Sequence, residues 1–329
     1  MRTPPLIIQG IRYWATLSII ALIRFLPYPI VTALFRFLAA LAFLVDPYHR
    51  KVAAVQMRAG LCIGTARLHV LKVFMNQADI LVDAVRYAYL SDEQIRKKLR
   101  VEGKENLEEA LASGRGLMMI TGHIGNWEIL SHIPRVTGTQ FCVMADVRKD
   151  PKLEAIVDNI RSRSGATILP PKGKALMLIR ELKKGRTIGI IVDNRGEEKD
   201  GLLCDVLGMP APTNPAPAFI AVKGNALVLP VYIVKQRDGY CIRFTKAVDA
   251  ASFGIGQEAV QGLSDFMQSW VSSVVRMYPD QWFWLYSRWL KRTDMRRIIR
   301  EGLDFREYVI DHYKMIMAGR SGVTDHTES

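Results

Sequence analysis

Apolar residues follow three patterns in succession along the chain. Residues 1–47 are almost continuously apolar and are broken at "LPYPI". Apolar positions then recur at helical spacing in "HRKVAAVQMRAG" and "RLHVLKVFMNQADILVDAVRYAYL". Further along, short apolar runs alternate with amphipathic segments. This succession predicts two apolar helices, a helical region, and then strands that alternate with helices.

The alternating part predicts the fold class. Its short apolar runs predict strands at 116–121, 140–147, 166–170, 186–194, 226–236 and 240–248. Its amphipathic segments predict helices at 151–165, 173–185, 214–225 and 258–279. Strands that alternate with helices favour an α/β fold, with a mainly parallel sheet flanked by helices on both faces.

The N-terminal segment has the composition of a membrane anchor. Arginine residues supply all its positive charge, at 2, 12, 24 and 36, and Asp46 is its one acid. A transmembrane helix needs about 20 consecutive apolar residues, and Arg24, Pro27, Pro29 and Arg36 interrupt every run before that length. We expect two helices embedded in or lying on a membrane, with arginines reaching lipid phosphates. A single tilted span, or a hairpin packed on the protein's own core, remains open.

Net charge and cysteine content limit the classes of molecule that the protein is expected to bind. The 329 residues carry a formal net charge of +13, which favours nucleic acid, anionic membranes, or acidic proteins and substrates. The four cysteines are scattered without metal-ligand spacing, so we expect reduced, mostly buried thiols and no metal site. We divide the chain into an anchor at 1–47, an α/β domain at 48–318 and a polar tail at 319–329.

The segment "TGHIGNWEIL", residues 121–130, carries the strongest candidate chemistry. His123 and Glu128 would lie roughly 140° apart on one helix, so they could not touch if both were helical. If a strand ends at Gly122 and a helix begins near Gly125, the imidazole can lean onto the first helical turn. Glu128 would then accept the Nδ1 proton and leave Nε2 free as a base. A histidine that only caps a helix is the alternative.

Other enzyme classes lack their signatures in this sequence. No G-x-S-x-G, P-loop or HExxH motif is present. The segment "QWFWLYSRW" and the basic residues after it could fill the core or face lipid headgroups. We expect a mixture, with Trp284 buried and a basic edge outside. Nucleic-acid binding is disfavoured because no nucleic-acid-binding motif accompanies the charge.

The segment "GHIGNWE" resembles the HX4D/E signature of the lysophospholipid acyltransferase superfamily. Its Gly-Asn-Trp filling is similar to the late acyltransferases of lipid A biosynthesis, and to mycobacterial relatives that acylate phosphatidylinositol mannosides. The resemblance continues in the same order through "DPKLEAIVDNIRSRSG", "GRTIGIIVDNRG" and "YPDQWFWLYSRWLKR". An apolar N-terminal anchor is also typical of that family.

The resemblance implies a glycerol-3-phosphate acyltransferase-like fold and a membrane-bound acyltransferase at the cytoplasmic face of a bacterial inner membrane. Its donor would be an acyl-carrier-protein or coenzyme A thioester, with no other cofactor. Its acceptor would be a hydroxyl of an anionic glycolipid, most simply a lipid A precursor. His123 would be the general base and Glu128 its partner. The residues expected to bind substrate are Asn126, Arg148, Arg161, Arg163, Asp193, Arg195 and Arg288.

Alternatives remain for several of these residues and for the acceptor. Arg161 and Arg163 could be a solvated helix end, and Asp193 with Asn194 could only form a turn. Val206-Leu207 replaces the aromatic pair usual in lipid A acyltransferases, which puts the acceptor in doubt more than the reaction. Another glycolipid or a lysophospholipid is therefore the second candidate acceptor. A non-catalytic lipid-binding protein is the competing class.

Overall fold

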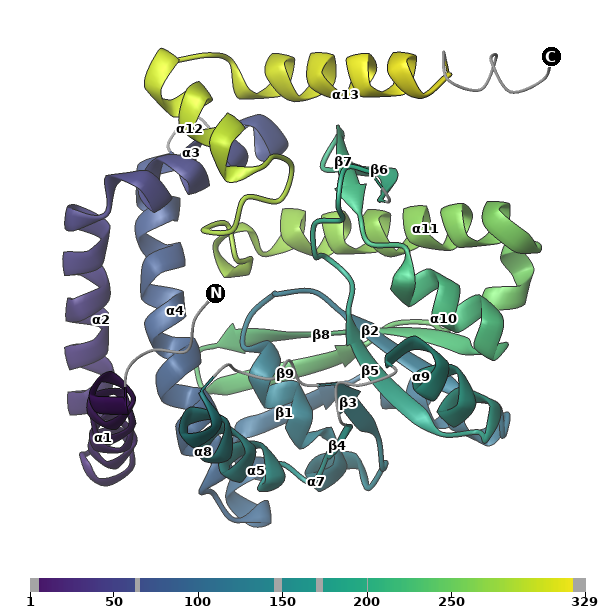
Figure 1. Cartoon of the computed structure of the whole chain (residues 1–329). Coiled ribbons are helices and arrows are strands. Elements are labelled where there is room, and N and C mark those ends of the chain that lie inside the picture. The colour runs from purple at the N-terminus through teal and green to yellow at the C-terminus, as the bar shows by residue number, and fades with distance from the viewer. Residues whose placement is uncertain (1–5, 63–65, 145–149, 170–173, 200, 322–329) are drawn as a thin grey trace.

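A mainly parallel β-sheet lies at the centre of the computed structural model (Figure 1), which describes residues 6–62, 66–144, 150–169, 174–199 and 201–321. The strand order is β1-β9-β8-β2-β5-β3-β4, and β10 pairs with β8. Only the β8–β9 and β8–β10 pairs are antiparallel within this sheet. The strands are β1 Leu99–Glu102, β2 Leu117–Thr121, β3 Cys142–Met144, β4 Thr167–Leu169, β5 Thr187–Ile191, β8 Leu227–Gln236, β9 Gly239–Phe244 and β10 Val248–Asp249.

Helices cover both faces of the sheet, as the alternating pattern predicts. Met118 and Ile120 of β2 pack on one face with α9, α10 and α11, whereas Leu117 and Met119 pack on the other with α5, α6 and α7. Side chains on both faces explain why β2 is apolar at nearly every position. The helices around the sheet are α5 Asp92–Lys98, α6 Lys104–Ala112, α7 Ile133–Thr137, α8 Pro151–Ser162, α9 Lys174–Lys183, α10 Ala216–Gly224 and α11 Gly256–Met277.

The sequence pattern did not predict helices α5 and α6, and it also missed two short β features. Strand β1 has four residues, too few to show a period. Strands β6 Leu202–Val206 and β7 Met209–Thr213 form a separate antiparallel hairpin that turns at Leu207 and Gly208. Both turn residues have positive φ (55° and 82°), which tight hairpin turns require but which leucine rarely adopts. The sequence therefore lacked the Asn-Gly or Asp-Gly signal by which such a hairpin is recognised.

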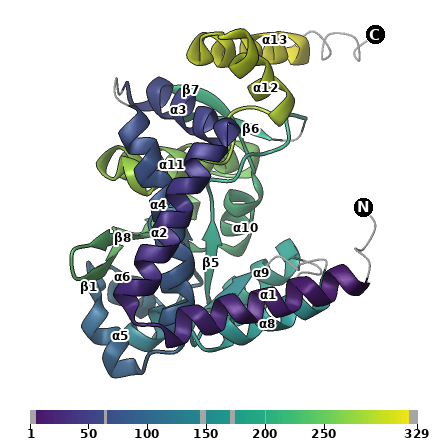
Figure 2. The ribbon, with the colours of Figure 1, turned by 90° about the vertical axis from the view of Figure 1, so that its left-hand side faces the viewer.

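The apolar N-terminal segment forms the two expected helices. Helices α1 Leu6–Phe25 and α2 Tyr28–Val45 meet at "LPYPI" and lie across one side of the molecule, as Figure 2 shows. Among the described residues, more than half of the exposed large hydrophobic side chains belong to these two helices, including Trp14 at 68% and Phe25 at 74% exposure. By length and composition, α2 is the one described helix that could cross a membrane.

The arginines of these helices contact protein groups. The Arg24 guanidinium lies 4.3 Å from the centre of the Tyr89 ring. Arg36 donates two 2.9 Å hydrogen bonds to the Asp79 carboxylate. The expectation that arginines reach lipid phosphates is therefore wrong for Arg36, whose guanidinium pairs with Asp79, and stays a prediction for Arg24.

A cluster of charges joins α2 to the sheet through α4 Ala66–Ala88. The Lys235 ammonium of β8 lies 3.0 Å from Asp79 and 3.2 Å from Asp83. Tyr240 donates a 2.6 Å hydrogen bond to Asp83. Burial, together with the charge of Asp83, raises the pKa of Tyr240, which stays a donor. The remaining helices, α3 Pro47–Leu61, α12 Arg292–Glu301 and α13 Phe305–Ser321, lie at the far end of α2 and α4 (Figure 1).

We predict that Lys235→Met lowers the free energy of unfolding by about 3 kcal/mol, because two buried carboxylates lose their shared cation. Chemical denaturation in a neutral detergent would measure this loss. Lys223→Met, at an exposed position of α10, is the matched control, with an expected change within about 0.5 kcal/mol. Equal effects of the two variants would show that the cluster does not hold the fold together.

Candidate active site

Two neighbouring strands bring the candidate catalytic residues together. His123 lies two residues after the end of β2, and Asp193 lies two residues after the end of β5. These strands are parallel and adjacent, so their carboxyl ends meet at one edge of the sheet, where open α/β sheets bind ligands. The backbone bond from Val192 N to Thr121 O, at 2.8 Å, continues the pairing into the loops.

The glycines of "GHIGNWE" meet two steric requirements of this turn. Gly125 has a φ of +59°, and a Cβ there would lie 1.9 Å from the Ile233 carbonyl oxygen. A Cβ on Gly122 would lie 3.0 Å from a carboxylate oxygen of Asp193. Any side chain at either position would thus displace the sheet or the carboxylate. The expected end of β2 before Gly122 is confirmed, and a 3₁₀ helix follows at Trp127–His132.

The partner of His123 is Asp193. The Nδ1 atom of His123 lies 2.8 Å from Asp193 Oδ1. The backbone N–H of His123 and the indole N–H of Trp282 each donate a 2.8 Å hydrogen bond to Oδ2. This corrects the expectation that Glu128 accepts the Nδ1 proton. The chain folds Asp193 under the imidazole from a strand seventy residues later, which local spacing could not reveal.

The carboxylate sets the protonation of the pair. Burial by itself disfavours the imidazolium, but the charge of Asp193, its hydrogen bond and the charge of Glu128 outweigh it, so the pKa of His123 is raised above 6.5. Asp193 is buried, which by itself disfavours its charge, yet the facing imidazole and the three donated bonds hold its pKa below 3.8. Asp193 therefore stays ionised, holds the proton on Nδ1 and leaves Nε2 as the basic atom.

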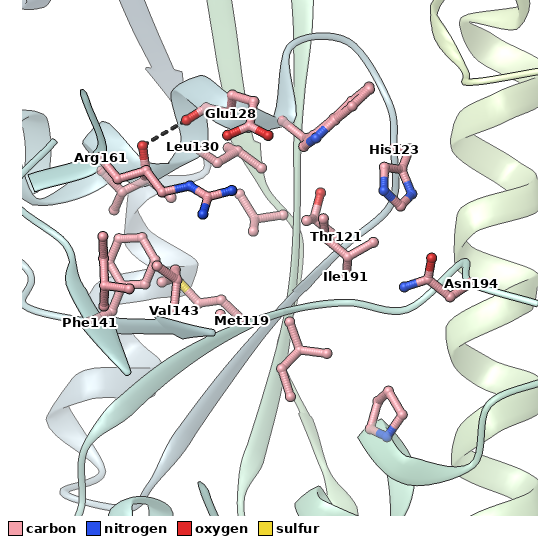
Figure 3. Close-up of a pocket in the computed structure, with 18 of the residues that line it drawn as sticks. Met119, Thr121, His123, Glu128, Leu130, Phe141, Val143, Arg161, Ile191 and Asn194 are labelled. Carbon is pink, nitrogen blue, oxygen red and sulfur yellow. Dashed lines mark hydrogen bonds between the residues drawn. The ribbon is translucent and has the colours of Figure 1, made fainter. Parts of the chain in front are cut away.

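His123 opens onto a pocket of about 500 Å³ (Figure 3). Its polar lining includes Glu128 and Arg161, which Figure 3 places on the side away from His123. The Nη1 atom of Arg161 is buried without a hydrogen-bond partner among the described residues. The rest of the wall is mostly apolar and includes Met119, Leu130, Ile133, Phe141, Val143, Ile168, Ile190, Ile220 and Val231.

Two of the predicted substrate-binding residues are buried structural groups. Asn126 is fully buried and donates a 3.2 Å hydrogen bond to the Ile80 carbonyl of α4. Arg288 is 1% exposed and donates to the Pro212 carbonyl, the Thr213 hydroxyl and the Gln268 amide oxygen. Neither lines the pocket. Both predictions are wrong, because these side chains hydrogen-bond to other segments of the chain and do not face the pocket.

Of the other predicted arginines, some line the pocket and some do not. Arg161 lines the pocket, and its role in binding substrate stays a prediction. Arg163 lies outside its lining and places its guanidinium 4.6 Å from the Tyr89 ring centre. Arg195 also lies outside the lining, and its backbone pairs with Thr213. Arg148 falls outside the residues that the structure describes. Of the predicted set, the pocket and its edge thus bring together His123, Glu128, Arg161 and Asp193.

Sequence reasoning missed Trp282 and Asn194 as site residues. The indole N–H of Trp282 donates a hydrogen bond to Asp193. Asn194, the residue after Asp193, lines the pocket. The available signals were the aromatic block around Trp282 and the Asp-Asn turn after β5. Trp284 is fully buried, as predicted, and its ring centre lies 4.5 Å from that of Trp282. The block is thus a core that supports the site.

Comparison with known proteins decides the family. A family model described as bacterial lipid A biosynthesis acyltransferase matches residues 5–291. The chain belongs to this family. It is 24% identical over 85% of its length to the lipid A biosynthesis palmitoleoyltransferase of Escherichia coli strain K12, covering 92% of that protein.

Similarity to mycobacterial proteins is more local. The chain is 26% identical to the phosphatidylinositol mannoside acyltransferase of Mycobacterium tuberculosis strain CDC 1551, over 58% of this chain and 60% of that protein. A solved structure, the 1-acyl-sn-glycerophosphate acyltransferase PlsC from Thermotoga maritima, aligns with 75% of this chain and 96% of the PlsC chain. The two are 17% identical in sequence, with a TM-score of 0.37. Membership in the acyltransferase family rests on the family model.

We predict that Asp193→Asn lowers the pKa of His123 relative to wild type, because the largest favourable charge beside the imidazolium is removed. Histidine resonances followed by NMR across a pH titration would measure this. Glu128→Gln is the control and should lower the same pKa by less, because the charge of Glu128 stabilises the imidazolium less than that of Asp193 does. A larger effect of Glu128→Gln would assign the pairing to Glu128.

Proposed function

We propose that this protein transfers a fatty acyl chain from a thioester donor to a hydroxyl of an anionic glycolipid. The observation that carries the proposal is the His123–Asp193 pair at the edge of a largely apolar pocket. Membership in the lipid A acyltransferase family supports the reaction class. A base with a buried carboxylate partner is what deprotonation of a hydroxyl nucleophile requires.

In the proposed mechanism His123 acts first as a base and then as an acid. Nε2 accepts the proton of the acceptor hydroxyl while its oxygen attacks the thioester carbonyl carbon, and a tetrahedral intermediate forms. Collapse of this intermediate breaks the carbon–sulfur bond, and the leaving thiolate receives the proton from Nε2. Asp193 stabilises the imidazolium between the two steps, because its carboxylate already contacts Nδ1 at 2.8 Å. The proposed mechanism requires neither a covalent acyl-enzyme nor a metal.

The apolar part of the pocket is the proposed site of the acyl chain. Phe141, Val143 and Met119 lie on the side away from His123 (Figure 3). A chain buried among these side chains would hold its carbonyl near the base, and burial of each methylene contributes about 0.8 kcal/mol. Arg161, whose buried Nη1 has no hydrogen-bond partner among the residues that the structure describes, is the proposed contact for a phosphate of the acceptor.

The acceptor and the membrane location are proposals that rest on the family, its relatives and the exposed apolar surface. We propose a lipid A precursor as the acceptor, which the family and the relative from Escherichia coli support. A phosphatidylinositol mannoside is the second candidate, favoured by the mycobacterial relative. The donor would be acyl-carrier protein or coenzyme A. We propose attachment to the cytoplasmic face of an inner membrane, and the exposed apolar side chains of α1 and α2 support the membrane attachment itself.

A transfer assay tests the function directly. Radiolabelled acyl chains on acyl-carrier protein or coenzyme A would be offered to a tetra-acylated lipid A precursor, a phosphatidylinositol mannoside and lysophospholipids. We expect label in the lipid A precursor with wild type and none with His123→Ala. Label in another acceptor would replace the proposed substrate. No label in any acceptor, with lipid still bound, would leave a non-catalytic lipid-binding protein.

We predict that Asp193→Asn reduces kcat by about 10²–10⁴-fold, because the correct imidazole tautomer is no longer held. His123 must be neutral to act as a base, and its pKa is raised, so wild-type activity should fall as pH drops through a value above 6.5. The acid limb of the pH–rate profile should move to lower pH in Asp193→Asn. An unchanged limb would mean that another group titrates there.

We predict that Val143→Phe shifts donor preference toward shorter acyl chains, because the added ring occupies the pocket away from His123. The ratio of kcat/KM for palmitoyl over decanoyl donors should fall about tenfold or more. Leu176→Phe, at an exposed position of α9 outside the pocket lining, is the control and should leave the ratio unchanged. Equal losses for both donors with Val143→Phe would indicate general misfolding and not chain selection.

A further inference from the structure

A second hollow, separate from the pocket at His123, lies between α3 and the start of α4. It has a volume of about 400 Å³, and its described lining consists of two small apolar residues and four cations: Ala54, Val70, Arg50, Lys51, Arg58 and Arg67. No carboxylate lines it within the described part of the chain. A concave surface whose polar groups are all cationic is suited to an anion of about the size of a phosphate-bearing headgroup.

Three of the four cations are available to a ligand. Lys51, Arg58 and Arg67 are exposed, and none forms an ion pair with another described residue. Nearby, the guanidinium groups of Arg292 and Arg296 on α12 lie 5.2 and 5.7 Å from the ring centre of Tyr48, one helical turn before Lys51. These side chains extend the positive potential beyond the hollow itself.

The fourth cation connects the hollow to the apolar helix α2. Arg50 donates a 2.7 Å hydrogen bond to the Phe43 carbonyl and a 3.2 Å bond to the Leu44 carbonyl, at the C-terminal end of α2. Leu44 and Val45 at that end are 60% and 78% exposed. Leu68, next in sequence to Arg67, is 68% exposed. The cations thus adjoin large exposed apolar side chains on two sides.

This combination distinguishes a lipid from an acidic protein. Apolar side chains that enter the boundary between acyl chains and headgroups, beside cations at headgroup level, are the usual arrangement at a bilayer surface. We propose that the hollow binds the phosphate of an anionic phospholipid headgroup from the membrane that holds α2. The proposal rests on the membrane attachment inferred above, and adds a specific headgroup site to it.

The test uses the full chain in micelles of a neutral maltoside detergent. Its thermal midpoint would be measured with dioctanoyl-phosphatidylglycerol, with dioctanoyl-phosphatidylcholine and with inorganic phosphate at the same bulk concentration. For wild type we expect phosphatidylglycerol alone to raise the midpoint, by roughly 3–6 °C. The shift should disappear in Arg58→Gln/Arg67→Gln and return in Arg58→Lys/Arg67→Lys. Arg180→Gln/Lys183→Gln, which removes two exposed cations from α9, should keep it.

Other outcomes would overturn the proposal. An equal shift with inorganic phosphate would identify a soluble anion as the ligand. A shift retained in Arg58→Gln/Arg67→Gln, or lost equally in the α9 control, would remove the hollow from lipid binding. A midpoint raised by acyl-carrier protein and not by phosphatidylglycerol, through the same two arginines, would make it a protein-docking surface. Because the readout is binding, failure of the transfer assay leaves this result intact, and the reverse also holds.

Discussion

A single buried carboxylate organises the candidate active site. Asp193 is 3% exposed, and an isolated charge at such a position is costly. Three donors compensate for the lost water: the imidazole and backbone N–H of His123, and the indole of Trp282. Each donor comes from a segment that must be folded correctly for the bond to form. Ionisation of Asp193 and the geometry of the loop at 122–125 therefore depend on each other.

The C-terminal aromatic block, through residues 281–283, holds the loop at 122–125 in place by hydrogen bonds. Gln281 accepts a bond from the Gly125 backbone N–H and pairs through its side chain with both backbone groups of Lys235. Trp282 reaches Asp193, and the Phe283 N–H donates to the His123 carbonyl. Successive residues of one short segment thus contact the base, its partner carboxylate and the neighbouring strand. The polar groups in this block act on the chemistry through position, without lining the pocket.

Periodicity and turn residues predicted much of the fold. The central strands, helices α8 to α11 and the two apolar N-terminal helices were visible because each repeats its own pattern over enough residues. Helices α5, α6, α12 and α13 were not predicted. Strand β1 was too short for this, and the β6–β7 hairpin turns on Leu207, whose positive φ no composition rule anticipates. His123 could be found from its glycine-flanked turn.

Asp193, the partner of His123, could not be found from sequence in the same way. Glu128 is close in sequence, whereas Asp193 is close in space because β2 and β5 are neighbours in the sheet. Strand order is a property of the whole fold, and one sequence does not state it. The same limit explains Asn126 and Arg288: their residue types suggested ligand contacts, but only the packed structure shows that their hydrogen bonds are made to other parts of the chain.

Helix α4 carries two attachments at consecutive residues. Asp79 receives Arg36 from the apolar helix α2, and the carbonyl of Ile80 receives Asn126 from the loop that holds His123. The contact that holds the apolar helix α2 and the contact that holds the loop of His123 are therefore made by adjacent residues of α4. If α2 lies in a bilayer, as proposed above, these two contacts couple the position of the imidazole to the lipid surface through α4. The depth at which His123 meets an acceptor hydroxyl would then be set by the packing of α2, α4 and the loop at 122–125.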